Sequence, residues 1–392
     1  MADRLPSLLP RFTEATTAAA VTALDGTLRW WTDAWTRPAP GFDLLRWSKL
    51  VADRRQPRWA HANEVVLETP IARLRDFSLA GADAVVPTLI LPPQAGHDSC
   101  IVDFSRRQSQ ITVLREAGLA NLYTLDWIGA TASTRHAGIE DYLAVVDAAV
   151  ELTGGGPVNL VGDCQGGWLA TVWAALRPER VNTLTIAGAP IDFHAGSPVI
   201  GDYVQALPRA FYEGLVALGG GVLRGDLLLG GFIVINPGSE VARQLALLGA
   251  LDEPAHVARY TEFEDWFKHT QDLPGTFYLW IVEHLFRRNA LVAGALEIGG
   301  QPIDLAKIDA PLYLLGGAAD HITPPPQVFA LAEHASTPAD RVLKRTTTGG
   351  HLGLFMGTEA LRDHWPPLMA DVYARSRRRR RRGSPLAARK PS

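Results

Sequence analysis

One cysteine of this chain lies between closely spaced glycines. The run Gly162-Asp163-Cys164-Gln165-Gly166 follows an apolar stretch and precedes a helix-forming one. This is the setting of a nucleophile elbow, a tight strand-to-helix turn in which serine usually occupies the central position. The turn places the sulphur at a helix N-terminus, where the helix dipole and free N–H groups favour thiolate over thiol. We therefore predict that Cys164 is a nucleophile, the alternative being an inert buried cysteine.

A cysteine nucleophile needs a base, and two residues further along the chain are placed to supply one. Asp320 follows a predicted strand at 311–315, and His351 follows the next predicted strand at 341–345. Nucleophile, acid and histidine in this order are typical of α/β-hydrolase folds. The carboxylate would orient the imidazole toward the sulphur and stabilise the imidazolium that forms. We predict that Cys164, Asp320 and His351 form a triad, although each partner alone would also fit a solvated loop.

Two ionisable residues stand beside this predicted triad. His321 follows Asp320 and is the other histidine that could act as base, but we expect it to support the triad from outside. Asp163 precedes Cys164, and a carboxylate beside the sulphur opposes thiolate formation unless it is turned away or paired. We therefore expect both residues to influence the triad without reacting.

An acyl-transfer site also needs donors for the oxyanion of its tetrahedral intermediate. The backbone N–H that follows the nucleophile, that of Gln165, is one expected donor. A second should come from the loop that starts at Pro92 and Pro93. Proline has no N–H to give, so the sequence favours Gln94 or Ala95.

Composition limits the other kinds of site. The chain has 392 residues, of which 47% are hydrophobic and 20% charged, as in a globular enzyme with a large core. Its two cysteines exclude a disulfide scaffold and a cysteine-rich zinc site, and they fit a reducing cytosol. We expect the second one, Cys100, to be buried and inert. We predict no metal and no cofactor.

The charge of the chain is unevenly distributed. The net charge is −3, but residues 375–392 carry +9, which leaves −12 on residues 1–374. An acidic body does not suggest a nucleic-acid-binding fold. We predict that the arginine-rich tail is disordered and solvated, or alternatively that it binds polyanions. No secretory signal and no apolar stretch long enough to span a membrane is apparent, so we expect a cytoplasmic protein.

The elements that must position the triad alternate along the chain. A strand pair at 65–74 opens this part, and apolar runs then alternate with helical patterns. The runs lie at 86–91, 119–125, 158–162, 182–186, 311–315 and 341–345, and the helical patterns at 109–117, 139–152, 166–176, 327–334 and 359–375. Continuous apolar strands separated by helices predict a mostly parallel sheet covered on both faces.

We divide the chain into three parts. Residues 1–63 form a predicted N-terminal helical extension, whose tryptophans are spaced to dock on a larger body. Residues 64–374 form the α/β catalytic domain, interrupted at about 190–300 by a helical cap insertion over the edge where ligands bind. Residues 375–392 form the tail.

Several motifs of the chain resemble those of one family, the polyhydroxyalkanoate (PHA) synthases. They are Pro92-Pro93, Asp126-Trp127, the glycine-flanked run around Cys164 up to Gly167, Pro-Ile-Asp-Phe at 190–193, Asn289-Ala290-Leu291, Ile303-Asp304-Leu305, Asp320-His321-Ile322 and Gly350-His351. The resemblance covers roughly residues 65–372, including the stretch from 263 to 305. The chain departs from the family at Asp163, where the synthases carry an apolar or aromatic residue, and in 196–231.

The resemblance implies an α/β-hydrolase fold and an acyltransferase that polymerises 3-hydroxyacyl-CoA with release of CoA. It assigns this chemistry to Cys164, His351 and Asp320. The CoA thioester is then a substrate, the growing polyester is bound, and a second copy or a second synthase subunit is a partner. The protein would be cytoplasmic or at the surface of polyester granules, where the tail could make a weak contact.

Sulphur suits this chemistry because thiolate attack on a thioester keeps the acyl group activated for the next acceptor, whereas serine would trap it as an ester. The same triad would also serve a cysteine hydrolase, such as an intracellular polyester depolymerase or a thioesterase. A third alternative is a granule-associated protein without activity.

Overall fold

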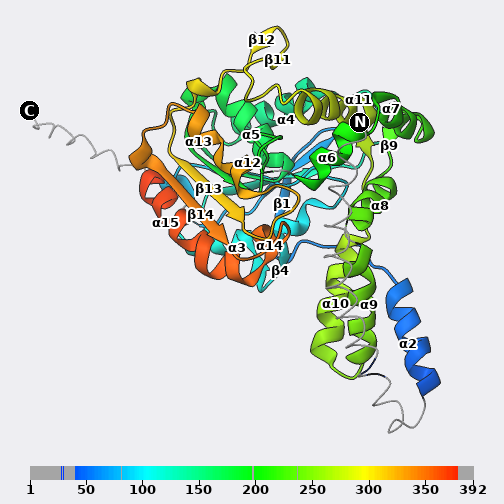
Figure 1. Ribbon diagram of the computed structural model, residues 1–392. Helices are drawn as coiled ribbons and strands as arrows, with labels where there is room; N and C mark the ends of the chain where they lie inside the picture. Colours follow the sequence, from blue (N-terminus) through cyan, green and yellow to red (C-terminus); the bar gives the residue numbers. More distant parts are fainter. Residues whose placement is uncertain are drawn as a thin grey trace, which may run out of the picture.

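The computed structural model describes residues 28, 30, 40–80, 82–196, 198–235 and 237–377. Most of the predicted N-terminal extension before residue 40, and the arginine-rich tail from residue 378, lie outside the described residues. Figure 1 shows a body built on a sheet, with a helical lobe projecting from one side.

An eight-stranded sheet forms the centre of the body. Its spatial order is β1-β2-β6-β3-β7-β8-β13-β14, and the pairs from β6 to β14 are parallel while β1 and β2 are antiparallel. The strands are β1 (Glu64–Glu68), β2 (Ala72–Asp76), β3 (Thr88–Leu91), β6 (Leu122–Trp127), β7 (Val158–Asp163), β8 (Val181–Ala187), β13 (Leu312–Gly317) and β14 (Val342–Thr347). Because β2 pairs antiparallel with both β1 and β6, it is the one reversed strand of this sheet. The predicted mostly parallel α/β sheet is therefore confirmed.

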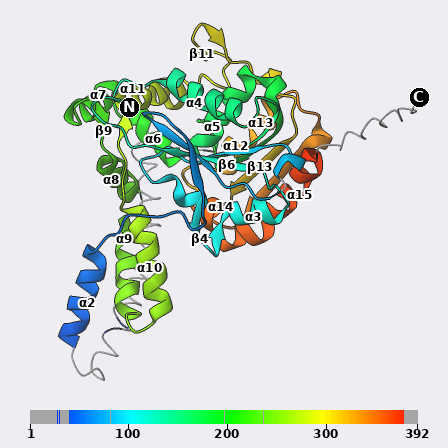
Figure 2. The same cartoon turned by 180° about the vertical axis from the view of Figure 1, so that it is seen from behind.

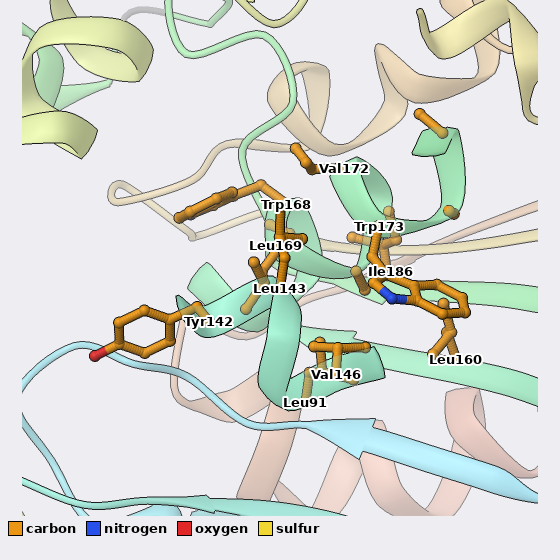
Figure 3. Close-up of a cluster of buried hydrophobic side chains, with 14 of the residues drawn as sticks. Leu91, Tyr142, Leu143, Val146, Leu160, Trp168, Leu169, Val172, Trp173 and Ile186 are labelled. Carbon is orange, nitrogen blue, oxygen red and sulfur yellow. The ribbon is translucent and has the colours of Figure 1, made fainter. Parts of the chain in front are cut away.

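Helices cover both faces of this sheet. Successive side chains of β7 point to opposite faces, so Leu160 joins one core cluster and Val161 another. The Leu160 cluster packs against α4 (Ile139–Leu152) and α5 (Gln165–Leu176), and Figure 3 shows side chains of both helices meeting there. The Val161 cluster packs against α3 (Gln110–Glu116), α14 (Gly353–Met356) and α15 (Trp365–Ser376).

The observed elements follow the predicted ones with local differences. The predicted helix at 327–334 is divided into α12 (Pro325–Phe329) and α13 (Leu331–His334). The closing helix begins with a π-helical segment at Ala360–His364 before α15. α15 also ends one residue beyond the expected start of the tail at residue 375, because Ser376 is fully buried and bonds to Val372 and Asn159.

Between β8 and β13 the chain forms a helical insertion. Its helices are α6 (Val199–Ala206), α7 (Arg209–Leu218), α8 (Gly225–Ile235), α9 (Pro237–Gly249), α10 (Pro254–Phe267) and α11 (Gly275–Trp280), which continues as a π-helix through Ile281–Arg287. Short strands β9 (Val222–Leu223) and β10 (Leu273–Pro274) pair within it. Figures 1 and 2 show α9 and α10 forming the projecting lobe together with α2 (Pro40–Ala52). The indole of Trp47 in α2 donates to the carbonyl of Gln244 in α9 at 2.8 Å.

Candidate active site

Cys164 occupies a sharp turn between β7 and α5. Its backbone has φ 49°, and Asn289 is the other non-glycine residue with positive φ among those described. Such a conformation is strained for a residue with a side chain, and it projects the sulphur out of the turn. The turn is tight enough to exclude a side chain at Gly166, where a Cβ would lie 2.0 Å from the carbonyl oxygen of Leu91. The glycine-flanked run thus forms the predicted elbow.

His351 and Asp320 meet at the ends of two neighbouring strands. Asp320 follows β13 and His351 follows β14, and these strands pair in parallel, so their carboxyl ends lie at the same edge. Nδ1 of His351 lies 2.8 Å from Oδ2 of Asp320, and both side chains are buried. The structure therefore brings together two residues that are far apart in the sequence.

The third member, Cys164, interacts with the same imidazole. Burial alone would lower the pKa of His351, but the Cys164 side chain and the Asp320 carboxylate, by charge and by hydrogen bonding, raise that pKa well above its ordinary value. Both neighbours of His351 therefore favour its protonated form. Such an arrangement would stabilise a thiolate–imidazolium pair once Cys164 gives up its proton.

The Asp320 carboxylate is fully provided with donors. Its Oδ1 accepts the backbone N–H groups of Ile322 and Thr323, both at 2.9 Å, and its Oδ2 faces His351. Burial would raise the pKa of Asp320, but the His351 charge and the hydrogen bonds from His351 and Thr323 lower it below its usual value. Asp320 therefore stays ionised and available to hold the imidazole.

Thr323 is a site residue that the sequence reasoning missed. Its side chain is buried and lies within hydrogen-bonding distance of both Asp320 and His351. A sequence signal did exist, since a carboxylate followed three residues later by a threonine is typical of a side chain that bonds to nearby backbone N–H groups. The predicted supporting residue, His321, is instead exposed at the cavity, and no hydrogen bond of its ring is found among the described residues.

A cavity of about 270 Å³ opens next to the sulphur. Its lining includes Cys164, Gln165 and His351. Aromatic side chains make up much of the rest of the lining. The insertion between β8 and β13 contributes Phe193, Phe232, Phe263, Trp266, Phe267 and Phe286, and α5 and α14 contribute Trp168 and Phe355. The insertion therefore covers the edge of the sheet where Cys164 and His351 lie. A cavity with such walls fits an apolar acyl group.

Arg243 also lines this cavity, but its charge is already paired with a carboxylate. The guanidinium of Arg243 lies over the rings of Phe263 and Phe267, about 5 Å from each centroid, and pairs with the fully buried Glu264. The same Glu264 accepts from Lys268 at 2.8 Å. Arg243 therefore holds the aromatic wall in place and leaves the cavity without a free positive charge at this point.

Of the residues expected to supply oxyanion donors, two line the cavity and one does not. Gln165 begins α5 and lines the cavity, as Ala95 and Pro93 do from the loop after β3. The Gln94 side chain is buried away from the cavity lining and donates to the Tyr142 hydroxyl at 3.1 Å. Of the two residues that the sequence favoured in this loop, Ala95 lines the cavity beside Cys164 and Gln94 does not.

Asp163 is buried completely behind the elbow. Neither of its oxygens has a hydrogen-bond donor of good geometry among the described residues, although the fully buried Gln110 amide lies near it. Burial raises the pKa of Asp163 to about 8, and the Gln110 amide and the His351 charge offset this only in part. The carboxyl group is therefore protonated at neutral pH, and it then carries no charge that would oppose a thiolate on Cys164.

The second cysteine of the chain lies in the core. Cys100 is buried, and burial together with the nearby Asp98 raises the pKa of its thiol well above the ordinary value, so it stays a thiol. Within the part of the chain that the structure describes, no three histidine, cysteine or acidic side chains are grouped to hold a metal ion. None of the helices formed by the described residues is long and apolar enough to cross a bilayer.

The structure has a mostly parallel sheet between two helical layers, with an elbow after one central strand. An acid and a histidine follow two later strands. Together these features define an α/β-hydrolase fold. Residues 75–367 match the model of a family described as "Protein of unknown function (DUF3141)". The match covers most of the chain, and the chain belongs to this family.

Curated relatives add a more specific similarity. The chain is 27% identical over 274 residues to the poly(3-hydroxyalkanoate) polymerase subunit PhaC of Allochromatium vinosum, covering 68% of this chain and 75% of the relative. It is 26% identical to PhaC of Haloferax mediterranei, covering 80% and 63% respectively. An uncharacterized protein of Rhizobium meliloti is 31% identical, but the match spans only 40% of that protein. The resemblance to the PHA synthases that the motifs predicted is confirmed.

Solved structures of similar fold are more distant in sequence. A carboxylesterase of Nitrososphaera gargenis has a TM-score of 0.49 at 14% identity, with 80% of this chain and 98% of that chain covered. A monoacylglycerol lipase of Paleococcus ferrophilus has a TM-score of 0.46 at 16% identity, with 75% and 98% covered. We assign the fold from the sheet and the elbow, and not from these likenesses.

Proposed function

We propose that this protein is a cysteine acyltransferase that polymerises 3-hydroxyacyl groups from their CoA thioesters. The similarity to PhaC polymerases supports an enzyme of the PHA synthase or hydrolase type. The observation that favours covalent acyl transfer is Cys164 at the elbow beside the buried His351–Asp320 pair, in the lining of an apolar cavity.

The proposed reaction begins when His351 takes the proton of Cys164. The thiolate attacks the thioester carbonyl, the oxyanion is stabilised by the N–H groups of Gln165 and the loop containing Ala95, and CoA leaves with the proton from His351. His351 then removes the proton from the 3-hydroxyl of the next unit or of the growing chain. That oxygen attacks the acyl–Cys164 thioester, forms an ester bond and regenerates the thiol.

The surroundings of Cys164 support this route. The aromatic walls of the cavity would exclude water from the acyl-enzyme, and synthesis requires this exclusion. A protonated Asp163 would allow the thiolate to form at neutral pH. The cytoplasmic or granule location, a second copy or synthase subunit as partner, and polyanion contact through the tail stay predictions.

Product analysis tests the proposal. Purified protein is incubated with 3-hydroxybutyryl-CoA, free CoA is measured, and the products are separated by size. Polymer with free CoA supports a synthase, whereas monomeric hydroxy acid with free CoA identifies a hydrolase. CoA release should be abolished in Cys164→Ala and kept in Cys100→Ala, since Cys100 lies in the core away from the cavity lining. Release unchanged in Cys164→Ala would overturn the proposal.

A further inference from the structure

Thr323 stands at the junction of the three segments that build the site. Its hydroxyl oxygen lies 2.9 Å from Oδ2 of Asp320, 3.0 Å from Nδ1 of His351 and 2.8 Å from the carbonyl oxygen of Gly188. Gly188 directly follows β8, and the other two residues follow β13 and β14. A single buried hydroxyl therefore connects the ends of three neighbouring strands.

The hydroxyl has one proton and two lone pairs, so it can donate only one hydrogen bond at a time to its three neighbours and must accept any other. Nδ1–H of His351 donates, and the Thr323 oxygen can accept from it while Asp320 accepts as well. The carboxylate of Asp320 and the carbonyl of Gly188 are both acceptors, and the hydroxyl proton turns to one of them at a time. Nδ1 carries its hydrogen in both the neutral and the charged ring, so the Thr323 oxygen can accept from His351 in either state.

We propose that Thr323 is a positioning residue that holds the His351 ring toward Cys164 through its hydroxyl bridge; this inference rests on the proposed function. A hydrogen bond to a charged group contributes more than one to a neutral group. Removal of the hydroxyl should therefore disfavour the imidazolium more than the neutral ring. The thiolate–imidazolium pair should become less populated at neutral pH.

The alternative is that Thr323 only fills space and satisfies Gly188. The two roles differ in their dependence on pH. A positioning role matters where the thiolate depends on His351, and it disappears at high pH, where a thiol ionises without a base. A packing role would slow the reaction of Cys164 at every pH.

Alkylation of Cys164 by iodoacetamide, followed by mass spectrometry of its peptide, separates these outcomes. Rates are measured at pH 7 and pH 10 for the wild type, Thr323→Val and Thr323→Ser, with thermal unfolding to confirm folding. We expect Thr323→Val to react roughly 10-fold more slowly at pH 7, to match the wild type at pH 10, and Thr323→Ser to restore the rate. If Thr323→Val does not fold, Thr323→Ala provides the same comparison.

Equal rates for wild type and Thr323→Val at pH 7, or the same slowing at both pH values, would overturn the inference alone. A wild-type Cys164 that reacts at pH 7 no faster than a free cysteine would overturn the proposed nucleophile and the inference with it. If Cys164 reacts as expected but 3-hydroxybutyryl-CoA releases no CoA, the inference stands and the proposed substrate fails.

Discussion

Nδ1 of His351 lies 2.8 Å from Oδ2 of Asp320, and this contact joins residues that follow two adjacent parallel strands. Because Asp320 accepts the imidazole N–H, the other ring nitrogen is left for Cys164. The pair thus fixes which nitrogen of the histidine can act as base.

Asp320→Asn tests this contact directly. The amide keeps the shape of the side chain but can donate to Nδ1, which would turn the imidazole to the wrong tautomer. We expect CoA release from 3-hydroxybutyryl-CoA to fall by on the order of 10³-fold or more, with little change in the thermal midpoint. Activity within a few-fold of the wild type would contradict a triad that includes Asp320.

Cys164→Ser should separate the two halves of the reaction. Serine can accept the acyl group but holds it as an oxygen ester, which is a poorer donor than a thioester. We expect slow acylation by 3-hydroxybutyryl-CoA and accumulation of protein with the mass of one acyl group. Intact-protein mass spectrometry measures this, with Cys164→Ala as the variant that should gain no mass. Rapid turnover of the serine variant would argue for a hydrolase.

Asp163→Asn should change how stability depends on pH. An unfolded aspartate ionises near pH 4, whereas the native Asp163 keeps its proton up to about pH 8. Between these values the native state binds one more proton than the unfolded state, so its stability falls as pH rises, by at most about 1.4 kcal/mol per pH unit. Asparagine does not titrate and should lack this decline.

Urea unfolding of both proteins between pH 5 and pH 7.5 provides the measurement. The stability of Asp163→Asn relative to the wild type should increase steadily over this range. A constant difference would mean that the carboxyl group is ionised in the native state, and that another group must relieve its repulsion of the sulphur.

Gly166→Ala should destabilise the elbow. A methyl group at this position would meet the Leu91 carbonyl oxygen at 2.0 Å, so β3 or α5 must move. We expect a loss of about 2 kcal/mol or more in the free energy of unfolding, as for other overpacked sites. Gly214→Ala, in α7 with open space around it, is the control and should be neutral or stabilising by up to about 1 kcal/mol. Equal midpoints in urea for both variants would count against the tight turn.

The sequence predicted the sheet and the meeting of Cys164, Asp320 and His351, because strand periodicity and the order of these residues are both local signals. Thr323 was missed because its role depends on where the ends of β8 and β13 come together. The burial of Asp163 beside Gln110 could not be predicted for the same reason, since Gln110 begins α3 and comes from another part of the chain. For the insertion, the sequence predicted a helical cap but not which of its aromatic side chains line the cavity. The helices of the insertion do not pair with the sheet, so no strand register indicates which of their side chains face the site.

The cavity is built from two sources that can vary independently. Cys164 and His351 belong to the sheet edge, whereas Phe232, Phe263 and Phe267 belong to α8 and α10 of the insertion. A substitution in these helices can reshape the chamber and leave Cys164 and His351 untouched. Under the proposed function, divergence within this lineage would retune which acyl chains are admitted while the chemistry at the sulphur is inherited unchanged.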